Sequence, residues 1–229
     1  AIREEMSAAQ LKECVKNTKR LKQLQETPNS PEALATMPFL QLSDLEKENK
    51  TIPIEVIQIQ DTPVLYHDLF TNGIVYLDLG FDLHALPKEL LPLTEIFARA
   101  LTEMGTEKED YVKLSQRIGK HTGGIHGSAV STTVRGSREN VSKIFMRGKA
   151  TIGQSTELLN ILKDILLTTK FDDRERLKQI VLEEKSGLES SLIPSGHAYA
   201  NRRVRAQFGG AGWVNDQISG IGYLFALRQ

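Results

Sequence analysis

The first part of the chain has the hydrophobic period of a helix. Between Met6 and Gln25, apolar residues recur mostly at steps of three and four positions, which is typical of one face of an amphipathic helix. These residues are Met6, Ala9, Leu11, Cys14, Val15, Leu21 and Leu24. We expect the helix to pack against other apolar surface through this stripe.

A short second helix and a polar run follow. Ser30 with Pro31 forms a good cap and first turn, so we predict a helix that continues through Ala35. Residues 43–50 are mostly polar, and we place a domain boundary there. The prediction is a helical linker arm over residues 1–46, followed by a domain over residues 47–229.

After Thr51 the pattern changes to the period of two that is typical of strands. Residues 54–59 form one β-branched run, and the runs 64–67 and 74–81 flank Asn72-Gly73. Because Asn-Gly is the strongest short-range indicator of a β-hairpin, we predict that these two runs pair. The second run has one packing face: Val75, Leu77, Leu79, Phe81 and Leu83. Its other face, which meets water or a partner, carries Tyr76, Asp78 and Asp82.

The remainder of the chain alternates helix pairs with a pair of strands. A helix over 87–104 has an apolar stripe, and Gly105 ends it. That stripe consists of Leu90, Leu93, Phe97, Leu101 and Met104. The further predicted elements are a helix over 109–119, strands over 129–135 and 143–146 that each close with Arg-Gly, a helix over 157–168, a long helix capped by Asp172-Asp173, and a helical region over 196–228.

This order of elements predicts the fold class. Runs of strands followed by pairs of helices favour an α+β fold, with a mostly antiparallel sheet and helices layered on one face. A doubly wound parallel sheet is disfavoured because its strands and helices alternate one by one.

Composition excludes several classes of protein. Lys and Arg number 29 and Asp and Glu number 29, so the chain lacks the basic excess of a dedicated nucleic-acid binder. The single cysteine, Cys14, allows no intramolecular disulfide and no cysteine zinc cluster. No apolar run approaches the roughly 20 residues that span a bilayer. We expect an intracellular protein, in the bacterial cytoplasm or in an organelle matrix or stroma, and a piece of a longer chain.

The residues taken alone indicate no catalytic centre. His121 and His126 flank a Gly-Gly turn, but no third metal ligand sits nearby, so we interpret them as surface histidines. We interpret His67 beside Asp68 in the same way, because adjacent strand residues point to opposite faces. The chain has no Gly-x-Ser-x-Gly elbow and no phosphate-binding glycine pattern, and Cys14 has no neighbouring histidine. We assign no catalytic, metal-binding or cofactor-binding residue.

One basic stretch leaves two alternatives open. Arg202, Arg203 and Arg205 give the last segment an excess of positive charge. They form either a charged helix face or a patch for acidic, carboxylate-bearing groups.

Several motifs together resemble the presequence proteases, which are peptide-degrading metallopeptidases of the inverzincin type. The similarity spans nearly the whole chain, in the order expected for the end of the family's helical linker and its third, non-catalytic domain. The motifs are 31–38, 63–74, 91–93, 103–106, 115–119, 121–124, 195–197 and Gly212-Trp213.

The resemblance also implies where zinc belongs. That family binds Zn²⁺ through His-x-x-Glu-His on a helix of its first domain, because these spacings share one helix face. If Gly105-Thr106 is set against the turn after that helix, Ile96 and Ala100 stand at the ligand positions and Arg99 at the position of the base. Isoleucine and alanine cannot bind zinc. The resemblance therefore implies zinc in the full-length enzyme and none bound by this segment.

Three functional hypotheses follow. The first is a non-catalytic segment of a zinc metalloendopeptidase, whose sheet face forms part of a closed chamber for short unstructured peptides. Its partners are then the other domains of the same polypeptide and the peptide substrates, with no nucleic acid and no membrane. The second is a freestanding protein-interaction scaffold on a degenerate metallopeptidase domain. The third, an enzyme with an unrelated site of its own, lacks a convergent cluster of residues.

Overall fold

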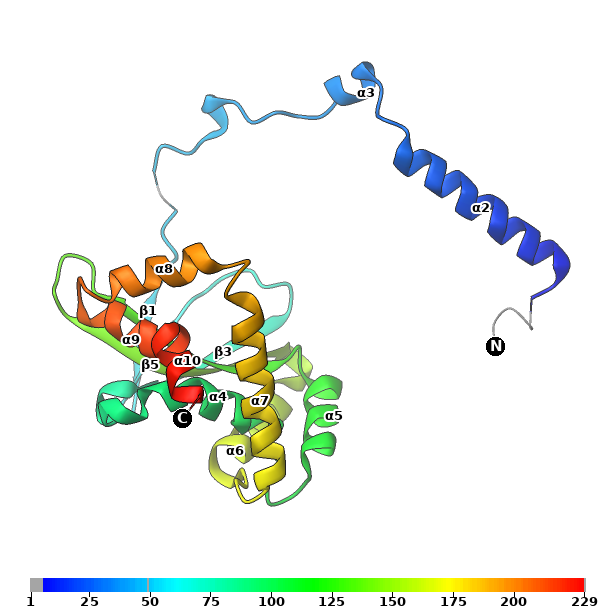
Figure 1. Cartoon of the computed structure of the whole chain (residues 1–229). Coiled ribbons are helices and arrows are strands. Elements are labelled where there is room, and N and C mark those ends of the chain that lie inside the picture. The colour runs from blue at the N-terminus through cyan, green and yellow to red at the C-terminus, as the bar shows by residue number, and fades with distance from the viewer. Residues whose placement is uncertain (1–5, 49, 229) are drawn as a thin grey trace. The chain divides into compact units, whose positions relative to one another are not determined.

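The structure, a computed structural model, describes residues 6–48 and 50–228. The chain divides into two compact units, Ala1–Asp68 and Leu69–Gln229, which are described separately (Figure 1). The predicted boundary near residue 46 stays a prediction. The predicted α+β class is confirmed by a mixture of helices and antiparallel strands.

The first unit begins with the two predicted helices. Helix α2 (Ala8–Glu26) starts at Ser7, whose Oγ accepts a hydrogen bond from the backbone N–H of Gln10 at 3.3 Å. Helix α3 (Pro31–Ala35) starts at Ser30, as predicted, and is followed by a 3₁₀ turn, η1 (Leu42–Asp44). Both helices lie wholly within the described residues, and neither has a buried side chain. The expected packing of the α2 stripe is therefore not met within this unit, and Cys14 is exposed.

The hairpin of the first unit corrects a prediction. Strand β1 (Glu55–Ile59) pairs with β2 (Thr62–Tyr66) across a turn in which Gln60 has a φ of 53°. Asn72-Gly73 also forms a turn, with φ values of 53° and 78°, but it precedes a strand that pairs elsewhere. The predicted hairpin between 64–67 and 74–81 is therefore wrong, because a turn dipeptide determines a local chain reversal and not which strands pair.

The second unit contains a three-stranded antiparallel sheet. Its strands are β3 (Ile74–Asp82), β4 (Ile125–Thr133) and β5 (Asn140–Thr151), in the order β3-β5-β4. The hairpin between β4 and β5 turns at Gly136, whose φ of 76° suits glycine. Arg147-Gly148, predicted to close a strand at about residue 146, instead lies inside β5. Because β5 is the central strand, its pairing with both neighbours extends it beyond the local pattern.

The helices of this unit follow the predicted order. They are η2 (Leu83–Ala85), η3 (Lys88–Leu93), α4 (Thr94–Glu103), α5 (Tyr111–His121), η4 (Ile152–Gln154), α6 (Ser155–Thr168), α7 (Arg174–Ser191), α8 (Gly196–Arg205), α9 (Gly210–Ser219) and α10 (Ile221–Leu227). The predicted helix over 87–104 begins as the 3₁₀ segment η3, which contains Pro92. Asp173 caps α7 by accepting a hydrogen bond from the N–H of Arg176 at 2.9 Å.

One face of the sheet packs against helices. Helices α4, α6 and α9 contact β5, and α9 lies over the strands in Figure 1. Along β5, buried residues alternate with partly or fully exposed ones. The inner positions Met146 and Ala150 share a core cluster with Leu101 of α4 and Leu158 and Ile165 of α6. The sheet therefore has one face in the core and one face turned away from it.

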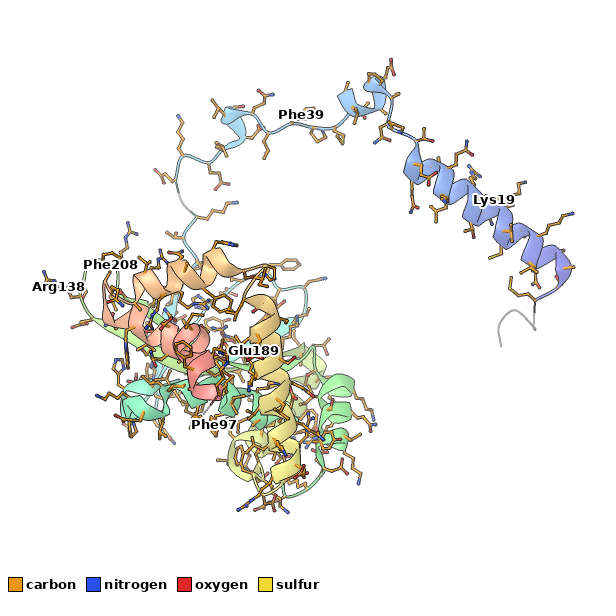
Figure 2. All side chains as sticks on the ribbon, in the orientation of Figure 1. Lys19, Phe39, Phe97, Arg138, Glu189 and Phe208 are labelled. Carbon is orange, nitrogen blue, oxygen red and sulfur yellow. The ribbon has the colours of Figure 1, made fainter. Side chains whose placement is uncertain are left out.

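Helix α4 is buried from two sides, which corrects the predicted stripe. Leu101 and Met104 are buried as predicted, but Leu90, Leu93 and Phe97 are between 43% and 50% exposed. Phe97 lies at the surface, labelled in Figure 2, and stacks on Phe171 with ring centroids 5.8 Å apart. Helices α7 and α10 cover the other side of α4 through a second buried cluster, and this second layer moves the buried face away from the stripe.

Candidate functional site

The face of the sheet that points away from the helices is the candidate site, and we name it the open sheet face. The strand register places Arg147 of β5 between Asp78 of β3 and His126 of β4. Because strand side chains alternate between faces, every second residue from this row shares the same face. The open sheet face consists of Tyr76, Asp78, Gly80 and Asp82 on β3, Val141, Lys143, Phe145, Arg147 and Lys149 on β5, and His126, Ser128, Val130 and Thr132 on β4.

Arg147 is held in the middle of this face by two neighbours. Its Nε donates a hydrogen bond to Oδ2 of Asp78 at 3.1 Å across the strand pair. Its guanidinium carbon lies 4.8 Å from the centroid of the Phe145 ring, within the range of a cation–π contact. Gly80 makes room for that ring, since a Cβ at this position would lie 2.8 Å from Cε1 of Phe145. The guanidinium therefore has a defined place on a partly exposed surface.

Charge is distributed unevenly over the open sheet face. The central strand carries Lys143, Arg147 and Lys149, whereas the carboxylates Asp78 and Asp82 stand on β3. The backbone N–H of His84 hydrogen-bonds to Asp82 at 3.0 Å and the ring of His84 lies 2.7 Å away, and these bonds hold the pKa of Asp82 below its ordinary value. Both carboxylates thus have partners nearby, and the basic side chains of β5 lie beside them.

A second cluster surrounds Arg99 on α4, at the position that the resemblance assigns to the catalytic base. Its Nε donates to Oε1 of Glu103 at 2.7 Å, and its Nη2 donates to Oε2 of Glu183 at 2.5 Å. Nη1 lies 3.4 Å from Oε2 of Glu184, so two carboxylates of α7 meet one guanidinium of α4. The hydrogen bond to Glu103, then that to Glu183, raises the pKa of Arg99, although partial burial opposes the shift. Arg99 is a permanent cation that ties α4 to α7.

The other two positions of the degenerate motif lie inside the protein. Ile96 and Ala100 are buried in one cluster with Met104, Ile180 and Tyr223. Aliphatic side chains offer no atom to a metal ion, so these residues do not fit a zinc site. Among residues 6–48 and 50–228, no group of three or more His, Cys, Asp or Glu is arranged to hold a metal ion.

The histidines singled out in the sequence have local partners or lie at the surface. His121, at the end of α5, lies with its Nδ1 3.1 Å from Oε1 of Gln154, and His126 is exposed on β4. His67 lies with its Nδ1 2.8 Å from the carbonyl oxygen of Pro53.

The basic stretch of α8 is partly used inside the fold. Arg203 donates to Oδ2 of Asp216 at 2.6 Å, and Asp216 is fully buried. Arg202 donates to the carbonyl oxygen of Ser219. These two arginines join α8 to α9, so the alternative of a patch for acidic groups does not describe them.

Sequence reasoning missed the basic row of β5. The predicted strand stopped at residue 146, and Arg147 and Lys149 were therefore not placed on the same face as Lys143. The alternation of Lys143, Phe145, Arg147 and Lys149 was the available indication.

The class of protein follows from the fold together with comparisons. The second unit is an α+β arrangement whose antiparallel sheet has helices on one face only. Residues 1–229 match the profile of a peptidase-associated family, the one described as associated with peptidases of family M16, subfamily C. The chain belongs to this family, which we call the peptidase-associated family below.

Individual relatives agree with this assignment. The chain is 41% identical over 227 residues to "Presequence protease 1, chloroplastic/mitochondrial" of Arabidopsis thaliana, and the match covers 99% of this chain and 21% of that protein. It is 33% identical over 214 residues to "Protein HypA" of Clostridium perfringens, covering 93% and 22% respectively. A "Presequence protease, mitochondrial" of Saccharomyces cerevisiae is 29% identical over 200 residues, covering 86% and 20%. The chain thus spans about a fifth of the length of these curated relatives.

Within the described residues, no helix is both long enough and apolar enough to cross a membrane.

Proposed function

We propose that this chain is a non-catalytic segment of a zinc metalloendopeptidase that degrades short unstructured peptides, and that its open sheet face forms part of the closed substrate chamber. The observation that carries the proposal is the open sheet face itself. Tyr76 is 61% exposed on it, and Phe145, Arg147 and the flanking lysines offer aromatic and cationic contacts to an extended chain. Membership of the peptidase-associated family supports the peptidase context.

In this proposal the catalytic zinc is bound by another part of the longer polypeptide. The segment itself contributes no metal ligand and no catalytic residue, since Ile96, Arg99 and Ala100 occupy the motif positions. The whole protein is the enzyme, and its other domains are the partners of this segment. We place it inside the cell, in the bacterial cytoplasm or in an organelle matrix or stroma. The organellar names of two relatives support the second location.

The linker arm over residues 1–46 belongs to the same proposal, with residues 47–229 as the metallopeptidase-like domain. Leu21, Leu24 and Phe39 are between 56% and 70% exposed in the arm, and Phe39 is labelled in Figure 2. Side chains of this kind need apolar surface to cover them, and the other domains of the polypeptide supply it. The arm then acts as the hinge between the halves of the enzyme.

Site-specific photo-crosslinking in the full-length protein tests the chamber assignment. A photoreactive amino acid replaces Tyr76 on the open sheet face or, as the control, Leu159 on the outer surface of α6, where the side chain is 55% exposed. A chelator keeps an unstructured test peptide intact during irradiation. We expect the peptide to crosslink at position 76 and not at position 159. Equal labelling at the two positions, or none at position 76, contradicts the proposal.

A freestanding interaction scaffold is the alternative, and one observation favours it. Leu90, Leu93 and Phe97 are about half exposed beside Phe171, an apolar surface that a partner protein could cover. The length of the parent open reading frame distinguishes the two hypotheses. An upstream His-x-x-Glu-His in the same frame supports the peptidase, and a short frame without this motif supports the scaffold.

A further inference from the structure

Arg147 has hydrogen-bonding capacity that the fold does not use. Within the described part of the chain, its side chain makes one hydrogen bond, from Nε to Asp78. The Nη1 and Nη2 groups therefore keep their donors for solvent or a ligand. The arginine side chain is 35% exposed, so a ligand can reach it. A planar guanidinium with donors of this kind binds carboxylates in a fixed geometry.

The guanidinium is also positioned before any ligand arrives. Asp78 holds its Nε edge, and the ring of Phe145 lies against it at 4.8 Å. This ring extends over β3 because Gly80 has no side chain. An arginine whose orientation is already determined loses less conformational entropy on binding, and preorganisation of this kind raises affinity.

The surroundings of Arg147 favour a negative ligand. Lys149 stands two residues along the same strand face, about 7 Å away by strand geometry. Lys143 stands on the same face in the other direction, and His126 is the cross-strand neighbour of Arg147 on β4. The nearest carboxylate, Asp78, is already bonded to Nε of the arginine. A ligand carboxylate therefore meets cations on β5 without a second acidic side chain on that strand.

We infer that Arg147, supported by Asp78 and Phe145 and flanked by Lys149, is a binding site for the carboxylate of an extended peptide. The inference rests on the proposed function, which brings peptides to the open sheet face, and it names the group that this face selects. Two sources can supply the carboxylate: the free C-terminus, which every short peptide carries, and an internal Asp or Glu side chain.

Titrations of the ¹⁵N-labelled 229-residue chain, followed by NMR, test the inference. Four N-acetylated peptides of equal length, rich in Gly and Ser, serve as probes. The first pair differs only in a C-terminal carboxylate or amide. The second pair is amidated and differs in one internal Glu or Gln. We expect a carboxylate peptide to bind about three- to tenfold more tightly than its neutral partner and to shift the amides of β3 and β5 around Arg147. The pair that shows the difference identifies the source of the carboxylate.

Arg147→Gln removes the charge, and Arg138→Gln is its matched control. Arg138 lies at the tip of the hairpin between β4 and β5, away from the Asp78–Arg147 row (Figure 2). We expect Arg147→Gln to abolish the preference for the carboxylate peptide and Arg138→Gln to retain it, while thermal unfolding shows that both variants fold. Arg147→Lys is expected to restore part of the preference because it keeps the charge without the planar fork.

The outcomes separate this inference from the proposed function. If acid and neutral peptides bind the open sheet face equally, or if Arg138→Gln has the same effect as Arg147→Gln, the inference is wrong and the chamber wall stands. If no peptide shifts an amide of the open sheet face, the inference is wrong, and crosslinking at position 76 decides the proposed function. If the carboxylate preference is present but that crosslink is absent, the proposed function fails and the site stands.

Discussion

The guanidinium of Arg99 lies 2.5 Å from the carboxylate of Glu183, although the two residues are 84 positions apart in the chain. This contact joins α4 to α7 at the position where the resemblance places the base of a catalytic motif. Glu103 and Glu184 approach the same cation, and Arg176 donates to Glu103 at 2.8 Å. The cluster therefore stabilises the packing of two helices, and it does not offer Arg99 to a substrate.

Arg99→Ala is expected to destabilise the chain more than Phe97→Ala. The arginine variant leaves Glu183 and Glu184 without their shared cation, a loss of about 1–3 kcal/mol. Phe97 is 47% exposed, so its truncation should cost about 1–2 kcal/mol rather than the 3–5 kcal/mol of a fully buried phenylalanine. Urea denaturation measures both, with Arg138→Ala as a control within about 0.5 kcal/mol of the original chain. A larger loss for Phe97→Ala means that the original stripe prediction was right.

Two glycines in helices should respond in opposite ways to alanine. At Gly212 of α9 an added Cβ would collide with the carbonyl oxygen of Arg205, and backbone cannot move aside as a flexible side chain can. At Gly187 of α7 an added Cβ meets no atom within 4 Å. We expect Gly212→Ala to lower the free energy of unfolding by about 1–3 kcal/mol and Gly187→Ala to raise it by about 0.5–1 kcal/mol. Thermal unfolding of the two variants checks the signs, and equal effects would show that packing around α9 adapts.

Asp164 of α6 should make stability depend on pH in the acid range. Burial raises its pKa, but hydrogen bonds from Lys108 at 2.7 Å and Arg117 at 2.9 Å outweigh burial and hold the pKa below its ordinary value of 3.8. A depressed pKa in the folded state stabilises the protein above pH 3.8, and this contribution is lost as pH falls through the folded pKa.

Asp164→Asn tests this linkage. We expect the variant to lose about 1–3 kcal/mol at neutral pH, and the difference from the original chain to shrink as pH falls below 3.8. Urea denaturation at a series of pH values measures the difference. A gap that stays constant down to acid pH means that the charge of Asp164 contributes nothing.

The purified 229-residue chain should bind no stoichiometric zinc. The motif positions Ile96 and Ala100 are buried and aliphatic, and Arg99 is occupied by carboxylates. Elemental analysis after dialysis checks the expectation, together with a melting temperature that a chelator leaves unchanged. One zinc ion per chain, or destabilisation by chelator, would reveal a site that these residues do not explain.

The arm should exchange its amide hydrogens faster than α4. Helix α2 has no buried side chain over its whole described length, and helices without tertiary packing are marginal in water. Helix α4 contributes Ala98, Ala100 and Leu101 to the core. Hydrogen exchange followed by mass spectrometry compares the two helices, and equal protection would show that the arm is packed in solution.

The sequence alone determined those features that depend on neighbouring residues. The periodicity of α2 and α6, the cap of α3 at Ser30 and the cap of α7 at Asp173 were predictable because helix formation and capping involve residues within a few positions of one another. The α+β class was predictable for the same reason, since it follows from the order of such local elements.

Only the tertiary structure decided which surfaces meet. Asn72-Gly73 turns as expected, yet the strand after it pairs with β5, because pairing depends on partners far along the chain. The stripe through Phe97 was misjudged because α4 is covered by a second layer, α7 and α10, which a single helix pattern does not reveal. Arg147 gained its place on the open sheet face only when β5 extended past residue 146 between two strands. Local chemistry sets the elements of this protein, and long-range pairing and layering decide which of their faces are buried and which remain available to a peptide.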